Sequence, residues 1–326
     1  MSDHEGPYFD DLTVGDVFDT APSLTLTEGR AAVHQSILGS RLRMSLDSPL
    51  SQRVAGIDLA DPSLVWDVAI GQSTLATRRV VANLFYRGLS FHRLPAIGDT
   101  LRTRTEVVGL RQNSSRPSGL AALRITTRDQ EGRLVLDFWR SAMLPLSHPE
   151  VLTGHSDDLS TIGVQQNSMS STGVSPLEAA MAGWELKGFP VSEGIAKGDF
   201  WTVRAGDLVS SATELARLSL NLAHVHHDRY SQSAGRLVYG GHTIGIALAQ
   251  LSRTLPNLLT IAGWASCDHT GPVREGDTLT SSIEVLDVQP WGPELKAMTL
   301  RILVFARRDD AEPAQVLAWK LTALSL

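Results

Sequence analysis

Apolar side chains recur at helical spacing most clearly near residue 250. Between 243 and 255 they share one face of a predicted helix: Ile244, Ala247, Leu248, Leu251 and Leu255. An earlier helix is predicted over 28–38, where Thr27 can cap the first turn and Gly39 can end the last. Residues 63–87 are predicted to form a further, mixed helical run.

Strand patterns follow in the first half of the chain. Four strand-like segments are separated by turns that contain Pro, Gly, Asn and Ser: Ser90–Arg93, Asp99–Leu110, Gly119–Thr127 and Leu134–Met143. A long helix followed by about four strands indicates an α+β fold, in which an antiparallel sheet wraps around the helix.

The second half of the chain repeats landmarks of the first about 180 residues later. The helix capped by Thr27 recurs with Asp207 as its predicted cap. Three dipeptides also recur: Gly15-Asp16 as Gly198-Asp199, Leu46-Asp47 as His227-Asp228, and Gly98-Asp99 as Gly276-Asp277. Gly71 and Gly241 lie only 170 residues apart, which predicts an insertion in the middle of one copy. We infer an internal duplication, with two copies of one fold in one chain.

Periodicity is lost between the two copies. Residues 146–180 are dense in Ser, Thr, Gly and Pro, which is typical of a linker that lies on the surface. The predicted organisation is therefore a repeat over 1–147, a linker over 148–183 and a second repeat over 184–326.

Composition narrows the class of protein. The 326 residues suit two domains, and a net charge of -6 gives no general attraction to nucleic acid or anionic lipid. The single cysteine, Cys267, excludes an internal disulfide and a multi-cysteine metal site, and fits a reducing compartment. The acidic N-terminus does not resemble a signal peptide, and no apolar run is long enough to span a bilayer. A cytoplasmic location is expected.

The candidate catalytic residues are concentrated between residues 218 and 250. Eight residues there contain a cluster of polar and titratable side chains: Asn221, His224, His226, His227 and Asp228. A glycine pair, Gly240-Gly241, then opens the helix predicted near 243. Titratable groups beside a glycine-led helix start suit acid/base chemistry on a carbonyl.

These residues resemble the MaoC-type hot-dog family in its double form. The hydratase motif of that family ends in His-x-Asp, which matches His226-His227-Asp228 and places Asn221 where the family has Asp. Tyr239-Gly240-Gly241 then matches the turn into the central hot-dog helix. In the first half, Ser40, Leu42 and Ser45 stand at the motif's Asp, Asn and His, and only Asp47 keeps the pattern. The resemblance implies a double hot-dog fold whose first repeat has lost its catalytic residues.

Four stretches are similar to the mesaconyl-CoA hydratase (β-methylmalyl-CoA dehydratase) branch of this family: 109–113, 134–140, 236–242 and 276–278. That branch also carries Asn and Ala where Asn221 and Ala223 stand. The resemblance therefore implies reversible addition of water to an enoyl-CoA, with a short, branched or carboxylated acyl group. It requires no cofactor besides the CoA of the substrate, and a homodimer is expected.

Hydration of an enoyl thioester needs a base, an acid and a group that stabilises the enolate-like oxygen. His226 is the candidate base because an imidazole titrates near neutral pH. The backbone amide of Gly241, at the positive end of the helix dipole, is the candidate oxyanion donor. Asn221 cannot act as a base, but its amide can orient water or a substrate carboxylate without repelling a dicarboxylate.

Further residues have alternative roles. Tyr239, Gly240 and His242 are candidate substrate-binding residues, although His242 can equally begin the helix. Arg236 can meet a CoA phosphate or remain solvated. His224 and His227 suit structural or solvent-facing roles, and Asp228 suits a loop cap. The histidine spacing matches no standard zinc site, so no metal is expected.

Three other functions remain open at this point. One is a general (R)-specific enoyl-CoA hydratase. Another is a thioesterase, which would need a carboxylate near the thioester carbon. The third is an acyl-CoA-binding protein without activity, because Asn221 replaces the family's Asp.

Overall fold

The structure is a computed structural model that describes residues 5–164, 175–192, 194–231, 235–308 and 311–326. The first repeat begins with the short elements η1 (Phe9–Asp11), β1 (Val17–Phe18) and β2 (Leu24–Thr25). Four helices and a 3-10 turn follow: α1 (Glu28–Leu38), α2 (Arg43–Leu46), α3 (Ser48–Ala55), α4 (Pro62–Gln72) and η2 (Ser73–Thr77). The repeat ends with four long strands: β3 (Ala82–Phe91), β4 (Thr100–Gln112), β5 (Ser118–Arg128) and β6 (Leu134–Pro145).

The second repeat uses the same order of elements. After α5 (Pro176–Ala180), it contains β7 (Phe200–Leu208), α6 (Ala212–Leu218), the 3-10 turn η4 (His224–His226) and α7 (Gly240–Thr254). Four long strands complete it: β8 (Leu258–His269), β9 (Thr278–Trp291), β10 (Leu295–Arg307) and β11 (Ala314–Ser325). The duplicated α+β organisation predicted from the sequence is therefore present.

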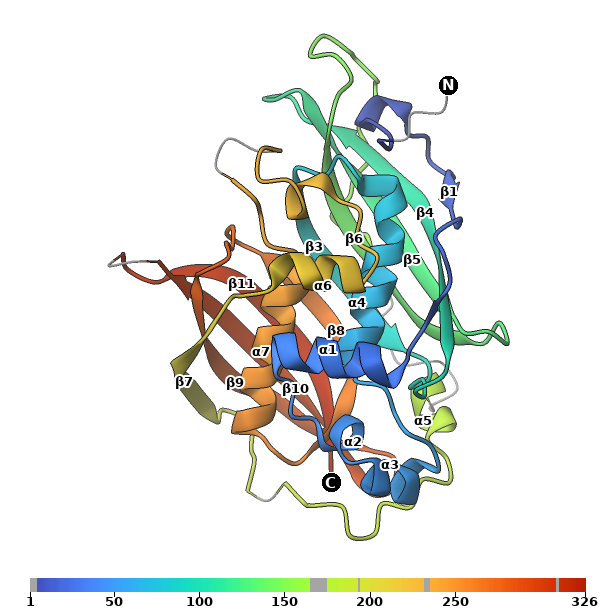
Figure 1. The fold of residues 1–326 in the computed structure, drawn as a ribbon, viewed down its shortest axis with the longest axis vertical. Coiled ribbons are helices and arrows are strands. Elements are labelled where there is room, and N and C mark those ends of the chain that lie inside the picture. Colours follow the sequence, from blue (N-terminus) through green and yellow to red (C-terminus); the bar gives the residue numbers. More distant parts are fainter. Residues whose placement is uncertain (1–4, 165–174, 193, 232–234, 309–310) are drawn as a thin grey trace.

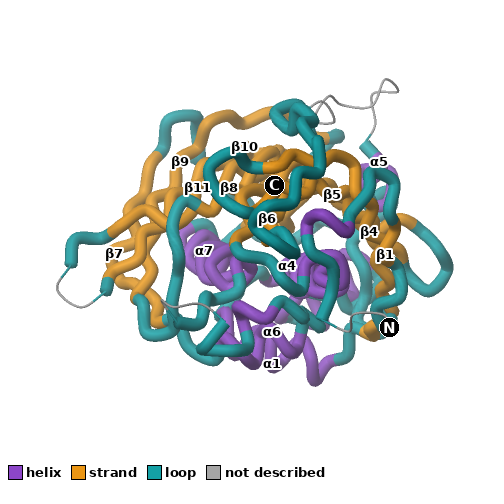
Figure 2. The backbone as a smooth tube through the Cα atoms, turned by 90° about the horizontal axis from the view of Figure 1, so that it is seen from above, coloured by secondary structure: helices purple, strands orange, loops and turns teal. Residues whose placement is uncertain are grey.

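One antiparallel sheet joins the two repeats. Its strand order is β1-β4-β5-β6-β3-β8-β11-β10-β9-β7, and β2 pairs with β4 beside this path. The repeats meet where β3 pairs with β8, with Tyr86 opposite Cys267. The sheet curves around α4 and α7, which lie side by side, while α1 and α6 lie on the open side (Figures 1 and 2). This is the predicted double hot-dog arrangement.

The central helices are buried because apolar side chains surround them. All eleven residues of α4 are buried, and α7 is buried from Gly241 to Ser252. Trp66 of α4 packs edge-on against Trp264 of β8 and Trp319 of β11. The core is therefore shared between the repeats. Among the described residues, no helix combines the length and apolar character that a membrane crossing requires.

Local sequence signals explain several helix ends. The Thr27 side chain accepts a hydrogen bond from the Arg30 amide, and Gly39 ends α1 with a left-handed φ of 77°, as predicted. Asp61 caps α4 by accepting from the Ser63 amide, with Pro62 in the first turn. The prediction of Asp207 as a cap was wrong. Asp207 lies in β7 and binds Arg253 and Gln250, whereas Ser211 precedes α6.

The predicted correspondence between Gly71 and Gly241 was also wrong. Gly241 lies in the first turn of α7, whereas Gly71 lies in the last turn of α4. The two central helices begin at Pro62 and Gly240, a separation that agrees with the other landmarks, so no insertion is needed. Gly71 has its own reason to be glycine, because a Cβ there would lie 1.7 Å from the backbone oxygen of Ser219.

Two further boundaries differ from the sequence prediction. The helical run predicted over 63–87 ends at Thr77, and β3 begins at Ala82. Of the predicted linker over 148–183, residues 165–174 lie outside the described residues. The part before residue 165 is anchored along the end of β4, where Ser156 forms a bridge with Arg111 and Asp157 accepts from the Leu110 amide through Oδ2.

Candidate active site

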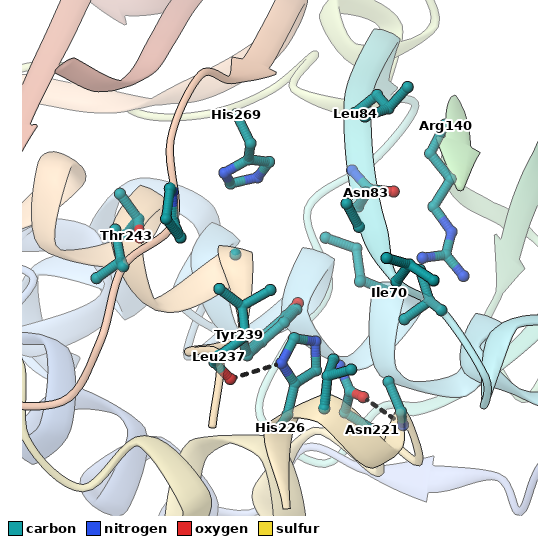
Figure 3. Close-up of a pocket in the computed structure, with 18 of the residues that line it drawn as sticks. Ile70, Asn83, Leu84, Arg140, Asn221, His226, Leu237, Tyr239, Thr243 and His269 are labelled. Atoms are coloured by element: carbon teal, nitrogen blue, oxygen red, sulfur yellow. Dashed lines mark hydrogen bonds between the residues drawn. The ribbon is translucent and has the colours of Figure 1, made fainter. Parts of the chain in front are cut away.

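A cavity of about 390 Å³ lies between the two repeats (Figure 3). The first repeat contributes side chains from α4, η2, β3 and β6: Ile70, Thr74, Asn83 and Arg140. The second repeat contributes the loop before α7, the start of α7 and the end of β8: Asn221, His226, Tyr239, Gly240, Thr243 and His269. Neither repeat could form this cavity alone.

The loop that carries Asn221 is fixed by backbone contacts to the first repeat. Leu220 adopts a φ of 62°, a left-handed conformation that is costly for a branched side chain. Asn221 then accepts a hydrogen bond from the Ala223 amide through Oδ1. The Leu222 amide donates to Thr74 Oγ1, and the His224 amide donates to the Arg78 carbonyl. These bonds hold the tightly turned segment against η2.

His226 is oriented by a carbonyl group. Its Nδ1 lies 3.0 Å from the Leu237 carbonyl oxygen, which can only accept, so Nδ1 carries the proton. Figure 3 shows Nε2 turned away from Leu237, toward the interior of the cavity. Burial is the main cause of a pKa of about 4 for His226, with a smaller contribution from nearby positive groups including Arg140, and the Leu237 bond only partly opposes them. At neutral pH the imidazole is therefore uncharged, and Nε2 can accept a proton.

The side-chain amide of Asn221 adds a hydrogen-bond donor to the acceptor that Nε2 of His226 provides. Its side chain is buried, and Oδ1 is occupied by Ala223, which leaves Nδ2 as its available donor toward the cavity. His227 binds the backbone oxygen of Asn221 through Nε2 at 2.6 Å, and this hydrogen bond stabilises the loop. The predicted pair of His226 and Asn221 is thus brought together on one wall of the cavity.

Helix α7 begins at the same wall. Gly240 lines the cavity, and a Cβ there would lie 2.6 Å from Nε2 of His269, so only glycine allows this packing. Gly241 is buried one residue further on, where a Cβ would lie 2.2 Å from Oδ1 of Asp67. The first amides of a helix lack intrahelical acceptors and carry the positive end of its dipole. The oxyanion role of Gly241 stays a prediction, and Gly240 is the glycine that lines the cavity.

Tyr239 connects the cavity to a buried polar chain. Its hydroxyl donates to Asp67 Oδ1 at 2.9 Å, and Asp67 Oδ2 lies 2.9 Å from His34 Nε2. All three side chains are buried and come from α1, α4 and the residue before α7. Burial raises the pKa of Asp67 and also raises that of Tyr239. This chain fixes the position of the Tyr239 ring, which packs against His226 with a centroid distance of 5.7 Å.

Comparisons with known proteins agree with this arrangement. No protein-family model matches the chain. Over nearly its whole length it superposes on a conserved hypothetical protein of Mycobacterium tuberculosis that has a double hot-dog fold, with 52% identity, a TM-score of 0.90 and 99% coverage of both chains. A Chloroflexus aurantiacus protein described as a MaoC-domain dehydratase superposes with 26% identity and a TM-score of 0.82, covering 100% of this chain and 99% of the other. The chain belongs to the MaoC-like double hot-dog family.

Two curated members of this family are similar to the chain in sequence. β-Methylmalyl-CoA dehydratase of Chloroflexus aurantiacus is 28% identical, with 98% of this chain and 97% of that protein covered. Mesaconyl-CoA hydratase of Cereibacter sphaeroides is 27% identical, with 96% of this chain and 92% of that protein covered. The sequence resemblance to this branch of the MaoC-like family is therefore confirmed.

Two predicted substrate-binding residues lie outside the cavity lining. His242 is fully buried in α7, where neither ring nitrogen has a partner and burial lowers its pKa to about 4. Arg236 binds Thr213 and forms an ion pair with Glu275. Contact of either residue with substrate stays a prediction for this MaoC-like chain.

The remaining residues of the polar cluster have structural contacts. Asp228 Oδ1 accepts from the Tyr230 amide, as a loop cap does. Cys267 is buried in β8, where burial raises the pKa of the thiol well above its ordinary value, so it is a poor nucleophile. Within the described residues, no three His, Cys, Asp or Glu side chains are grouped as a metal site requires.

The equivalent loop of the first repeat carries no base. Ser40 and Ser45 both donate to Asp61 Oδ2, and Asp47 caps α3 by accepting from the Leu50 amide. Ser40, Ser45 and Asp61 border a separate cavity of about 330 Å³, which His34 also lines. Of the two equivalent loops, only that of the second repeat therefore carries histidine, and its catalytic role stays a prediction.

Sequence reasoning missed four residues of the site or its support: His34, Asp67, Arg140 and His269. His34 and Asp67 belong to the first repeat, which lacks the motif, so no motif indicated them. Arg140 lies within the 134–140 stretch that resembles the mesaconyl-CoA hydratase branch, and that resemblance was its one available signal. His269 ends β8, and burial lowers its pKa to about 4.

Proposed function

We propose that this protein is an acyl-CoA hydratase/dehydratase, which reversibly adds water across the α,β double bond of an enoyl-CoA. The observation that carries the proposal is the orientation of His226, whose tethered Nδ1 leaves an uncharged Nε2 facing the cavity. Two curated relatives named as a dehydratase and a hydratase of CoA thioesters support the same reaction. The reaction class is a hydro-lyase and needs no cofactor besides the CoA of the substrate.

The arrangement assigns one role to each group. His226 Nε2 takes a proton from the water as its oxygen bonds to Cβ, and the same nitrogen then delivers that proton to Cα, so that one water is added across the double bond; dehydration runs these steps in reverse. Donors at the start of α7 stabilise the thioester oxygen as it gains charge, because that helix end is electropositive. Asn221 orients the water through Nδ2, since an amide donates where the family's carboxylate would accept.

The proposed substrate is mesaconyl-CoA, with β-methylmalyl-CoA as its hydrated form. The names of the two curated relatives support this choice. A general (R)-specific enoyl-CoA hydratase is the alternative within the same reaction class. It would accept crotonyl-CoA at least as well as mesaconyl-CoA.

Thioesterase activity has less support. A carboxylate mechanism needs Asp or Glu beside the thioester, and the described residues that line the cavity include neither. The buried carboxylate of Asp67 does not line the cavity and binds the hydroxyl of Tyr239, which does. A binding protein without activity would have no need for a base whose tautomer is fixed by Leu237.

One assay distinguishes these functions. The protein is incubated with mesaconyl-CoA and, separately, crotonyl-CoA, while enoyl-thioester absorbance and free thiol are followed together. A hydratase consumes the enoyl absorbance without release of thiol. Release of thiol would identify a thioesterase, and binding with neither change would identify a binding protein.

The cytoplasmic location and the homodimer stay predictions from the sequence. In a homodimer, each protomer would retain its own complete cavity, because both repeats that line it belong to one chain. Size-exclusion chromatography with light scattering tests the dimer. A monomer that retains full activity would show that assembly is unnecessary.

A further inference from the structure

Arg140 is a buried cation in the wall of the cavity. Its side chain extends from β6 and is 3% exposed. One guanidinium nitrogen, Nη2, donates to Thr77 Oγ1 at 2.7 Å and to the Ser73 carbonyl at 3.2 Å. Its Nε is buried without a partner, and among the described residues no carboxylate forms an ion pair with it. By contrast, Arg124 of β5 is half exposed and pairs with Asp137.

An unpaired buried charge is costly unless a ligand supplies the opposite charge. An arginine stays protonated in proteins, so it cannot escape this cost by losing its proton. Burial lowers the pKa of Arg140, which reports the same unfavourable environment. The neutral contacts to Ser73 and Thr77 orient the guanidinium but do not neutralise it. The described residues that line the cavity contain no acidic side chain, so an anion must come from outside the chain.

Asn83 adds a second unsatisfied group to the same wall. Its side-chain oxygen and nitrogen are both buried and have no hydrogen-bond partner. Asn83 lies on β3, the strand that pairs with β6, and Figure 3 shows it near Arg140. Buried polar atoms are almost always hydrogen-bonded in folded proteins. The two side chains therefore form an incomplete polar pair that faces the cavity.

We propose that Arg140, assisted by Asn83, binds a carboxylate carried by the acyl group of the substrate. This inference rests on the proposed function and names the residue that selects a dicarboxylic acyl-CoA. In the mesaconyl group, whose main chain has four carbons, the distal carboxylate is bonded to the β carbon, which is the carbon that water attacks. Its receptor must then lie close to the base, and Arg140 and His226 both line the same cavity. The planar fork of arginine suits two-point binding of a carboxylate.

Substitution of Arg140 tests the assignment. Arg140→Met removes the charge but keeps much of the side-chain volume, and Arg140→Lys keeps the charge but loses the fork. We expect Arg140→Met to lower kcat/KM for mesaconyl-CoA by about 100-fold, as loss of a charged hydrogen bond to a ligand does. The value for crotonyl-CoA should change by less than about threefold, and Arg140→Lys should fall between. Arg124→Met, outside the cavity lining, is the matched control and should leave both values unchanged.

Equal losses on both substrates would overturn the proposal, because they would assign Arg140 to the thioester or to the fold. An unchanged rate with mesaconyl-CoA would overturn it as well. A ligand series in the wild-type protein keeps the test available if Arg140→Met does not fold. The dissociation constant of mesaconyl-CoA should be about 100-fold lower than that of its C4 methyl ester, which lacks the charge. Equal affinities would contradict the assignment.

The binding measurement also separates this proposal from the proposed function. If the wild-type protein hydrates neither substrate, the hydratase assignment fails. Arg140 would still be supported as the carboxylate receptor if the wild-type protein binds mesaconyl-CoA more tightly than its C4 methyl ester and Arg140→Met loses this preference. If the wild-type protein hydrates crotonyl-CoA and Arg140→Met does not alter selectivity, the receptor fails alone.

Discussion

The protonation of His226 gives a prediction about the pH dependence of hydration. Burial lowers the pKa of this imidazole to about 4, and neighbouring positive groups, including Arg140, act in the same direction. A base must be uncharged to accept a proton. Because the pKa is lowered, the uncharged form persists as the pH falls, and activity should be retained in mildly acidic solution.

The size of the effect follows from the shift. At pH ~5.5 a histidine with a pKa of about 4 is ~97% uncharged, whereas one with the ordinary value of ~6.5 is only ~9% uncharged. Between pH ~7.5 and pH ~5.5 the shifted base therefore loses almost nothing. An ordinary histidine would lose about tenfold over the same range.

The corresponding assay measures kcat/KM for crotonyl-CoA at both pH values, because this quantity reports the ionisation of the free enzyme. Circular dichroism at each pH confirms that the fold is intact. We expect the two rate constants to agree within about twofold. A tenfold decrease at the lower pH, with the fold unchanged, would refute the argument that burial keeps His226 uncharged.

Three further predictions concern the surroundings of the site. Tyr239→Phe removes the hydroxyl that donates to buried Asp67, and urea unfolding should show a loss of ~1–2 kcal/mol; no loss would mean that this bond does not stabilise the wall. Gly241→Ala would place a Cβ 2.2 Å from Asp67 Oδ1 and should cost ~1–3 kcal/mol, whereas Gly29→Ala, whose nearest neighbour is 4.0 Å away, should stabilise α1 by ~0.5–1 kcal/mol. The same effect from both glycine substitutions would contradict the packing argument. The pKa of His242 in the folded protein, about 4, lies below the pKa of the same side chain in the unfolded protein. As the pH decreases, the unfolded state therefore binds a proton first, and the free energy of unfolding decreases. Relative to His242→Leu, the wild-type protein should lose ~2 kcal/mol between pH ~7.5 and pH ~5, and a difference that is independent of pH would exclude this burial.

Much of the fold followed from local patterns. The helix predicted over roughly 28–38 is present as α1, because a capping threonine and a terminating glycine mark both of its ends. The strands near 100–143 were placed within two residues, since alternation and turn residues are local signals. The run over 63–87 was misassigned because its second part mixes apolar and polar residues without a clear helical or strand period. Its strand character is decided by pairing with β6 and β8, which the local sequence does not encode.

The site was predicted only where a motif marked it. His226 and Asn221 lie five residues apart in one loop, and both line the cavity. Asp67 and Tyr239 are 172 residues apart, and only the packing of the two central helices brings them into contact. Arg140 lies in a strand, where the sequence alone does not distinguish a solvated arginine from a buried one. Its burial results from the cover that α4 and η2 provide.

The most direct test of the account is the hydration rate of His226→Gln beside that of His224→Gln. Glutamine removes the proton-accepting imidazole in both variants, but His224 lies outside the cavity lining and holds its loop through its backbone. We expect His226→Gln to lower kcat for enoyl-CoA hydration by about 1,000-fold with the fold intact, and His224→Gln to remain within about twofold of wild type. Full activity in folded His226→Gln would contradict the assignment of His226 as the base.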